Sequence, residues 1–207
     1  EFREYWGGIF KAHPWLDGPS DSYLGFWERG GGASGEHSHA MNFWQFLAHT
    51  LGAGRVTSVD ARVRYVSEGA ARYDDLCACH LQTESGMIGR VVQDVVTQPV
   101  KKEAFVQGTR GSLRWINGYN ATGDAVVLAL TGQEPQVTHV PKTRPDDFIQ
   151  ELLHIDRSLA PGAPASPLSL ERGLETMMVV AAAHRSEQTG RRVRVDYAKG
   201  FTAAALL

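Results

Sequence analysis

Residues 56–65, VTSVDARVRY, decide the fold of this chain because apolar and polar side chains alternate along them. In an extended segment Val59, Ala61 and Val63 fall on one face, while Asp60 and Arg62 fall on the other. Further runs of this kind continue to residue 140, separated by turn sequences such as SEG, ESG, GTRG and TGQEP. Strands joined by short turns predict an antiparallel sheet over residues 55–141 with one face covered.

Helical patterns lie on both sides of this sheet in the sequence. Residues 30–54 predict a glycine-rich turn followed by a helix, whose apolar stripe ends at glycines. Residues 143–207 predict two helices and a closing strand, and residues 1–30 are expected to form a loop region. The whole chain, 1–207, is therefore expected to be a single α/β (α+β) domain. Its sheet would be open and mostly antiparallel, with helices packed on one face.

The composition of the chain excludes several classes of protein. It has 207 residues, of which 43% are hydrophobic and 21% charged, and a formal net charge of -2. These values are typical of a globular domain and unlike the basic surface of a nucleic-acid-binding protein. No apolar run approaches the ~20 residues that cross a membrane, and the start of the chain lacks the pattern of a signal peptide. We therefore expect neither a nucleic-acid nor a membrane partner.

The two cysteines, Cys77 and Cys79, are separated by one residue within an alternating run. Both side chains would point to the same face of a strand, and a disulfide between them would close almost no loop. Reduced thiols are therefore expected, which favours a cytoplasmic location. A metal site formed by these cysteines and His80 is the alternative, but no second ligand cluster accompanies it, so no metal is expected.

The segment 30–44, GGGASGEHSHAMNFW, carries the strongest sign of chemistry. Glu36, His39 and Asn42 are spaced three apart, so one helix face would present a carboxylate, an imidazole and an amide. An imidazole titrates near neutral pH and is suited to take a proton from a substrate hydroxyl. The carboxylate and amide could orient that substrate. The alternatives are a flexible loop with a capping histidine, or a zinc site formed with His37.

These residues resemble a known family. GGGASGEHSHAMNFWQFL resembles the glycine-rich turn and acidic-x-x-His segment that opens the C-terminal domain of Gfo/Idh/MocA oxidoreductases. AFVQGTRGSLRW is similar to a strand, turn and strand of that domain, and SLERGLETMMVVAAAHRSEQTGRRVRV to its last helix and closing strand. AHPWLDGPSDSY looks like the substrate loop of members that act on sugars, which makes His13 and Trp15 candidate substrate-binding residues.

The resemblance implies a two-domain enzyme that uses NAD or NADP. The cofactor would be bound mainly by an N-terminal Rossmann domain that this sequence does not contain, because no strand-linked GxGxxG and no Glu-Lys-Pro motif occur in it. The chain, which starts abruptly, is therefore expected to be a fragment. The family's histidine corresponds to His39, while Glu36 and Asn42 stand where the family has aspartates. The outer sheet face implies a homo-oligomer.

The sequence thus predicts the C-terminal part of an NAD(P)-dependent oxidoreductase that acts on a sugar or polyol-like substrate. His39 is the expected proton-transfer group, Glu36 its catalytic neighbour and Asn42 a substrate ligand. This chain alone is expected to be catalytically inactive. Two alternatives stay open: a non-catalytic ligand-binding or dimerisation module, and a redox-neutral lyase or glycosidase of the same family.

Overall fold

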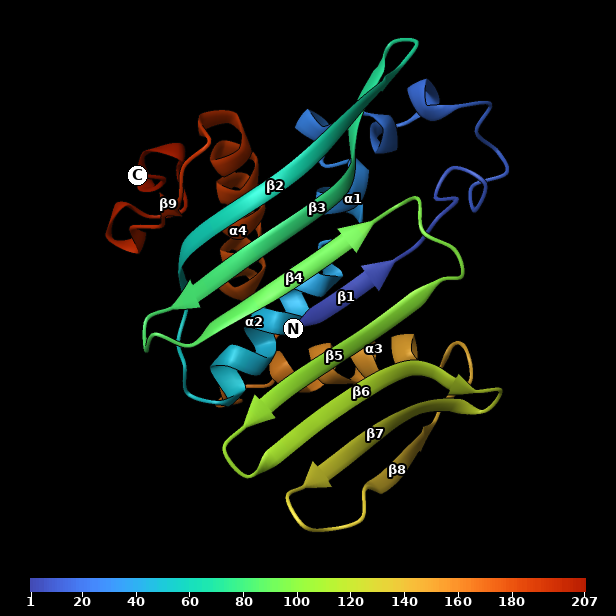
Figure 1. Ribbon diagram of the computed structural model, residues 1–207, viewed down its shortest axis with the longest axis vertical. Coiled ribbons are helices and arrows are strands. Elements are labelled where there is room, and N and C mark those ends of the chain that lie inside the picture. Colours follow the sequence, from blue (N-terminus) through green and yellow to red (C-terminus); the bar gives the residue numbers. More distant parts are fainter. The chain divides into compact units, whose positions relative to one another are not determined.

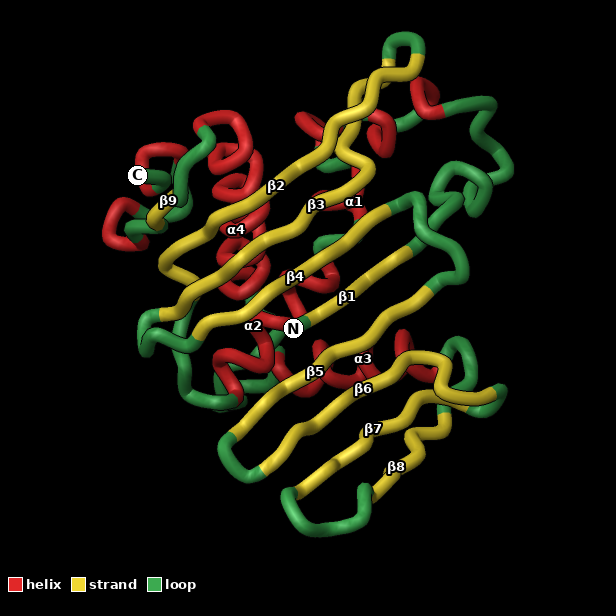
Figure 2. Tube along the Cα trace, in the orientation of Figure 1, coloured by secondary structure: helices red, strands yellow, loops and turns green.

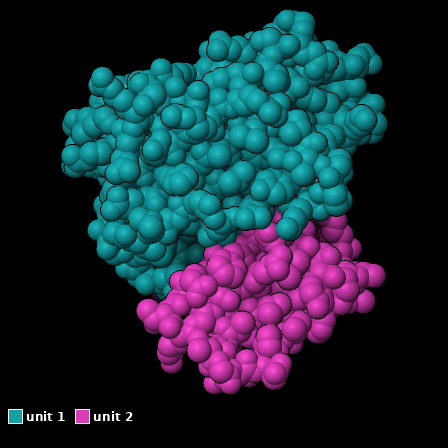
Figure 3. Space-filling view, viewed as in Figure 1, with its two compact units in different colours: residues 1–101, 170–207 teal, residues 102–169 magenta.

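The structure, a computed structural model, describes residues 1–207. The chain divides into two compact units, which Figure 3 colours separately. Unit 1 comprises residues 1–101 and 170–207, and unit 2 comprises residues 102–169. Each unit has its own run of hydrogen-bonded strands, and the two are described in turn. The organisation of residues 1–207 as one domain stays a prediction.

The sheet of unit 1 is formed by strands from both ends and the middle of the chain (Figures 1 and 2). Its strands are β1 (Phe2–Tyr5), β2 (Val56–Glu68), β3 (Ala71–Thr83), β4 (Ile88–Asp94) and β9 (Val193–Arg194). They lie in the order β1-β4-β3-β2-β9. All neighbours are antiparallel except β1 and β4, which are parallel.

Strand β1 corrects the prediction that residues 1–30 form only a loop region. Phe2 pairs with Val91 and Tyr5 with Asp94, so the start of the chain extends the sheet beyond β4. The strand has only four residues, and its buried positions are occupied by Phe2 and Glu4. A carboxylate at a buried position and the short length together removed the alternation on which the prediction depended.

Helices cover one face of this sheet (Figure 1). They are α1 (Gly32–Glu36), α2 (His39–Thr50) and α4 (Leu170–Thr189). Short 3-10 helices occur at Pro19–Asp21, Tyr23–Gly25, Trp27–Arg29, Tyr197–Lys199 and Ala203–Ala205. The prediction of a mostly antiparallel sheet with helices on one face is confirmed.

Helix α4 also completes the edge of β2 where the short strand β9 ends. The backbone N–H of Ala61 donates to Ser186 Oγ at 3.0 Å, and that of Val63 donates to Glu187 Oε2 at 2.9 Å. Side chains of α4 thereby satisfy edge donors that would otherwise be left without partners beneath the helix.

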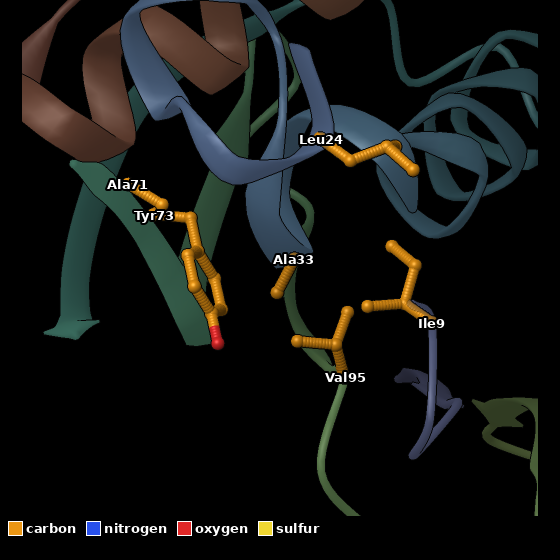
Figure 4. Packing of buried hydrophobic residues seen from close by; sticks show 6 residues of the cluster. All are labelled: Ile9, Leu24, Ala33, Ala71, Tyr73 and Val95. Atoms are coloured by element: carbon orange, nitrogen blue, oxygen red, sulfur yellow. The ribbon is translucent and has the colours of Figure 1, made fainter. Parts of the chain in front are cut away.

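A hydrophobic cluster fixes the irregular segment after β1 to the sheet (Figure 4). Its buried members are Ile9, Leu24, Ala33, Ala71, Tyr73 and Val95. They come from the N-terminal segment, the first turn of α1, β3 and the end of β4. Full burial of a side chain such as leucine or isoleucine contributes roughly 1.5–3 kcal/mol, so the loop is held by packing, not by regular structure.

Unit 2 is an antiparallel meander followed by one helix. Its strands are β5 (Lys101–Gly108), β6 (Gly111–Asn120), β7 (Gly123–Leu130) and β8 (Gln136–Pro141), and its helix is α3 (Asp146–Ser158). The buried carboxylate of Asp124 organises one end of the meander. It accepts hydrogen bonds from the Gly118 backbone, Trp115 and Asn117, and forms an ion pair with Lys142 at 3.0 Å.

No helix of the chain is both long enough and apolar enough to cross a membrane.

Candidate active site

Two glycines make the turn that leads into α1. A Cβ atom on Gly31 would lie 2.2 Å from the carbonyl oxygen of Tyr23. Gly32 has φ of +75°, and a Cβ there would lie 2.2 Å from Asp74 Oδ1. Only glycine allows the backbone to approach so closely, and only glycine adopts this φ without strain. Two of the three glycines are therefore explained by close packing, Gly31 against the 3-10 helix Tyr23–Gly25 and Gly32 against β3.

The start of α1 is bonded to the buried carboxylate of Asp74. Ser34 N donates to Asp74 Oδ2 at 2.7 Å, and burial raises the pKa of Asp74 to about 6. A helix N-terminus preceded by glycines is a typical phosphate site, but here a carboxylate of the protein occupies it. The residues of this chain therefore do not form a cradle for the pyrophosphate of a dinucleotide.

A second buried group links α1 to α4 and β2. His184 Nε2 lies 2.8 Å from Ser34 Oγ, and His184 Nδ1 lies 2.6 Å from the hydroxyl of Tyr65. The imidazole also stacks on Trp27, with ring centroids 4.6 Å apart. Burial lowers the pKa of His184 to about 4, so the ring is neutral at physiological pH. A neutral imidazole has one donor and one acceptor, and the two hydroxyls satisfy both.

The chain breaks its helical path between α1 and α2 at His37. This residue has φ of -98° and ψ of 26°, and its ring is buried. It stacks on Trp6 at 5.8 Å, and its Nδ1 lies 3.5 Å from Glu4 Oε1. The prediction that Glu36 and His39 lie on one continuous helix is therefore wrong. His37 is buried against Glu4 of β1 and Trp6 just after it, and this turns the chain between Glu36 and His39.

Glu36, the last residue of α1, is held by a residue that the sequence did not reveal. The hydroxyl of Tyr23 donates to Glu36 Oε2 at 2.6 Å. This hydrogen bond, together with burial, raises the pKa of Tyr23 to about 12. The phenol therefore remains protonated and keeps the carboxylate in place. Thirteen positions separate the pair, so no local spacing could have indicated it.

His39 is the first residue of α2, and its side chain is exposed. Asn42 lies one turn further on the same face of the helix. Its Nδ2 donates to Thr176 Oγ1 of α4 at 3.1 Å, and Gln45 Nε2 donates to the same oxygen at 3.1 Å. The side-chain amide oxygen of Asn42, Oδ1, accepts no hydrogen bond within the chain. The helix therefore presents an imidazole and an amide oxygen to the outside.

The loop containing His13 and Trp15 forms a separate aromatic group. His13 Nδ1 is 2.8 Å from the carbonyl oxygen of Ile9, and its ring meets Trp15 edge-on at 5.1 Å. Trp15 is 73% exposed. No hydrogen bond or ion pair joins these two side chains to Glu36, His39 or Asn42. No hydrogen bond or ion pair joins Glu36, His39 and Asn42 to one another either, so their action as one site stays a prediction.

The two cysteines are buried free thiols with sulfur atoms 3.5 Å apart. The hydrogen bond between them and their burial raise the pKa of the Cys77 thiol. His80 is exposed and points to the opposite face of β3. The alternative of a single metal ion bound by Cys77, Cys79 and His80 is therefore wrong.

Comparison with known proteins identifies the family. Residues 9–114 match the model of the GFO/IDH/MocA C-terminal domain. The match spans half of the chain, and the chain belongs to this family. None of the curated proteins matches by sequence.

Solved structures share the fold of the chain. An oxidoreductase from Agrobacterium radiobacter, in complex with NAD+, L-tartaric acid and magnesium, is 20% identical with a TM-score of 0.66. Levoglucosan dehydrogenase in complex with NADH and levoglucosan is 17% identical with a TM-score of 0.70. The aldose-aldose oxidoreductase from Caulobacter crescentus, complexed with glycerol, is 19% identical with a TM-score of 0.65.

The coverage of these matches is unequal. They cover 93%, 94% and 94% of this chain but only 55%, 57% and 55% of the three solved chains. The chain therefore spans little more than half the length of the oxidoreductases it resembles. At these identities the likeness to the solved structures shows the fold alone. That the chain corresponds to a C-terminal domain is shown by the family match.

Proposed function

We propose that this chain is the substrate-binding part of an NAD(P)-dependent oxidoreductase that acts on a sugar or polyol-like substrate. One observation carries the proposal: an exposed histidine, His39, opens α2 three positions after a carboxylate, Glu36, that Tyr23 holds in place. The family and the ligands of its structural neighbours support the substrate class, since levoglucosan is bound by one and glycerol by another.

The proposed roles follow from the side chains present. His39 takes the proton from the substrate hydroxyl that is oxidised, because an imidazole exposed at the start of a helix can reach a bound hydroxyl and act as a general base. Glu36, fixed by the Tyr23 phenol, supports the imidazole or accepts a second hydroxyl of the substrate. The side-chain oxygen of Asn42, whose Nδ2 is bonded to Thr176, accepts a hydrogen bond from a third hydroxyl of the substrate.

His13 and Trp15 are proposed to contact the sugar ring. An indole face that is largely exposed can stack on the apolar C–H face of a sugar, and the edge-on contact with His13 holds it in position. These residues lie on a loop held by packing of its neighbours, Ile9 and Leu24. Such a loop can move as substrate binds.

The cofactor is proposed to be NAD or NADP, bound mainly outside this chain and accepting the hydride when present. This division agrees with the glycine turn, which the Asp74 carboxylate occupies and which leaves no place for a pyrophosphate. A cytoplasmic location is part of the proposal and is supported by the two buried free thiols. No nucleic-acid or membrane partner is proposed.

A homo-oligomer is proposed through the sheet face that the helices leave open. In unit 1 this face alternates charged and apolar side chains, including Asp60, Arg62, His80 and Ile88, all of which are exposed. A sheet face with exposed apolar side chains such as Ile88 is left uncovered in a single chain, and contact with a second copy would bury it. Light scattering of the chain tests it: a mass of one chain, 22.7 kDa, would contradict the proposal.

The activity is tested with the longer protein that carries this chain. Reduction of NAD and NADP is followed against a panel of sugars and polyols. The change His39→Ala is expected to lower kcat by about 10²–10⁴-fold, the usual contribution of a general base, with little change in stability. His139→Ala is the matched control, since His139 is an exposed histidine on β8 and belongs neither to the candidate site nor to the unit 1 sheet face proposed for self-association.

The outcome separates the candidate functions. Equal rates for the His39 and His139 variants would remove His39 from the mechanism. Transient cofactor reduction without net turnover would favour a redox-neutral lyase or glycosidase. Sugar binding without any cofactor reduction would favour a ligand-binding module.

A further inference from the structure

A cavity of about 690 Å³ lies at one end of the unit 1 sheet. Its walls come from the start of β2, the end of β3, strand β9 and the segment that follows β9 (Figure 1). The volume is that of a small-molecule site. None of the residues discussed above as the candidate active site lines this cavity.

The acidic side chains of this cavity already have partners. Glu84 accepts hydrogen bonds from the backbone and the guanidinium of Arg55, each at 2.9 Å. Arg55 also lies over the ring of Tyr197, 4.5 Å from its centroid. Asp196 accepts from the backbone of Ala198 at 3.1 Å. Asp196 also forms an ion pair with Lys199 at 3.9 Å, so both acidic side chains of the walls are already engaged.

Two arginines of the same cavity have no such partner. Arg192 and Arg194 flank Val193, whose side chain is buried under α4. Because side chains alternate along a strand, both guanidinium groups point away from the helices. Both are exposed, and no carboxylate lies within ion-pair distance of either. Two uncompensated positive charges therefore remain in the walls of the cavity.

Neutral hydrogen-bonding groups stand beside these charges. Arg194 is paired with Ser58 on β2, and Ser58 is paired with Gln82 on β3. Directly paired residues of adjacent strands share a face, so a guanidinium, a hydroxyl and an amide form one row along the cavity wall. Tyr197 adds an aromatic surface to the lining of the cavity.

We propose that this cavity binds a small organic phosphate. Arginine pairs match the geometry of phosphate oxygens and are favoured for recognising them. The cavity is several times larger than a phosphate group, so the Tyr197 side accommodates the organic part of the ligand. The proposal does not depend on the proposed oxidoreductase function, because the two sites share no residue.

Binding is measured on the full chain by calorimetry, with glucose 6-phosphate as the probe and glucose as its uncharged counterpart. The phosphate ester is expected to bind and glucose is not. Arg192→Ala and Arg194→Ala are each expected to weaken binding about tenfold or more, which corresponds to loss of one charged contact. Arg185→Ala is the matched control, an exposed arginine on α4 outside the cavity, and is expected to leave binding unchanged.

Several results would overturn the assignment. Equal weakening by the Arg185 variant would show that phosphate is attracted by general surface charge. Malonate bound as tightly as the phosphate ester would contradict the ligand class. Arg194→Gln is added because it retains a long polar side chain; unchanged binding in a folded Arg194→Gln protein would remove this arginine from the site. A change in chain mass in solution caused by the arginine variants, without phosphate binding, would make the arginines an interface.

Discussion

The buried pair Asp74 and His184 predicts a specific dependence of stability on pH. Burial raises the pKa of Asp74 to about 6 and lowers the pKa of His184 to about 4. Both shifts favour the neutral form. Their effects on stability nevertheless have opposite signs, because one group is an acid and the other is a base.

The signs follow from the protons bound in the folded and unfolded states. Asp74 takes up its proton in the folded protein near pH 6 but in the unfolded chain only near 3.8, so it adds stability as the pH falls through 6. His184 takes up its proton in the unfolded chain near 6.5 but in the folded protein only near 4, so it removes stability as the pH falls through 6.5.

The two magnitudes are similar. Shifts in pKa of this size change the free energy of unfolding by roughly 3 kcal/mol for each group over its full titration range. Between pH 7 and pH 4.5 the change is about 2 kcal/mol. The contributions of Asp74 and His184 therefore nearly cancel in the wild-type chain. Removing either group is expected to reveal the effect of the other.

The assay is urea unfolding at about pH 7 and about pH 4.5, followed by tryptophan fluorescence. Relative to wild type, Asp74→Asn is expected to lose about 2 kcal/mol more on acidification, since only His184 then titrates. His184→Gln is expected to gain about 2 kcal/mol by the same comparison. The double variant is expected to regain the weak dependence of the wild type. Comparison of the change with pH, not of absolute stability, removes the packing cost of each substitution.

Parallel pH profiles of Asp74→Asn and wild type would refute the reasoning for Asp74. They would mean that its carboxyl group titrates alike in the folded and unfolded chain, in spite of its burial and its bond to Ser34. A His184→Gln profile that loses stability on acidification would refute the assigned sign for His184.

Three further predictions concern packing and reactivity. Gly32→Ala is expected to cost about 3 kcal/mol, from left-handed strain and the collision with the bonded Asp74 carboxylate, whereas Gly30→Ala, with a similar φ and open space, is expected to cost about 1 kcal/mol; equal losses in thermal unfolding would contradict this. Ser186→Ala is expected to cost about 1–3 kcal/mol by leaving a strand N–H without its acceptor, and Thr189→Ala, at an exposed position, less than about 0.5 kcal/mol. Both buried cysteines are expected to react with a thiol reagent only after unfolding, and rapid labelling of the native chain would show otherwise.

The sheet was predictable because its signal is local. Alternation along residues 56–65 and the turn sequences after it depend only on neighbours in the chain, and strands β2 to β8 lie where this pattern placed them. Helix α4 was equally accessible, since its apolar positions recur at helical spacing. Strand β1 was missed because its identity depends on pairing with β4, more than eighty positions away.

The candidate site was predictable only in part, for the same physical reason. The exposed imidazole of His39 follows from its place at the start of a helix. The break before it depends on burial of His37 against Trp6 and Glu4, which are contributed by the other end of the N-terminal segment. The Tyr23 phenol bonded to Glu36 is a tertiary contact of the same kind. Spacing along one helix cannot reveal either of them.

The arrangement around α1 explains why buried polar groups lie close in sequence to the exposed histidine proposed for proton transfer. Ser34 is bonded through its N–H to Asp74 and through its hydroxyl to His184, so a helix of five residues is attached to both β3 and α4. An isolated helix of this length is unstable in water. The displaced pKa values of Asp74 and His184 show that holding it costs free energy when either group is charged. The hydrogen bonds of Ser34 to Asp74 and His184 fix the backbone shortly before His39, while the side chain of His39 stays exposed. Accurate positioning of a proton-transfer group requires such a fixed backbone.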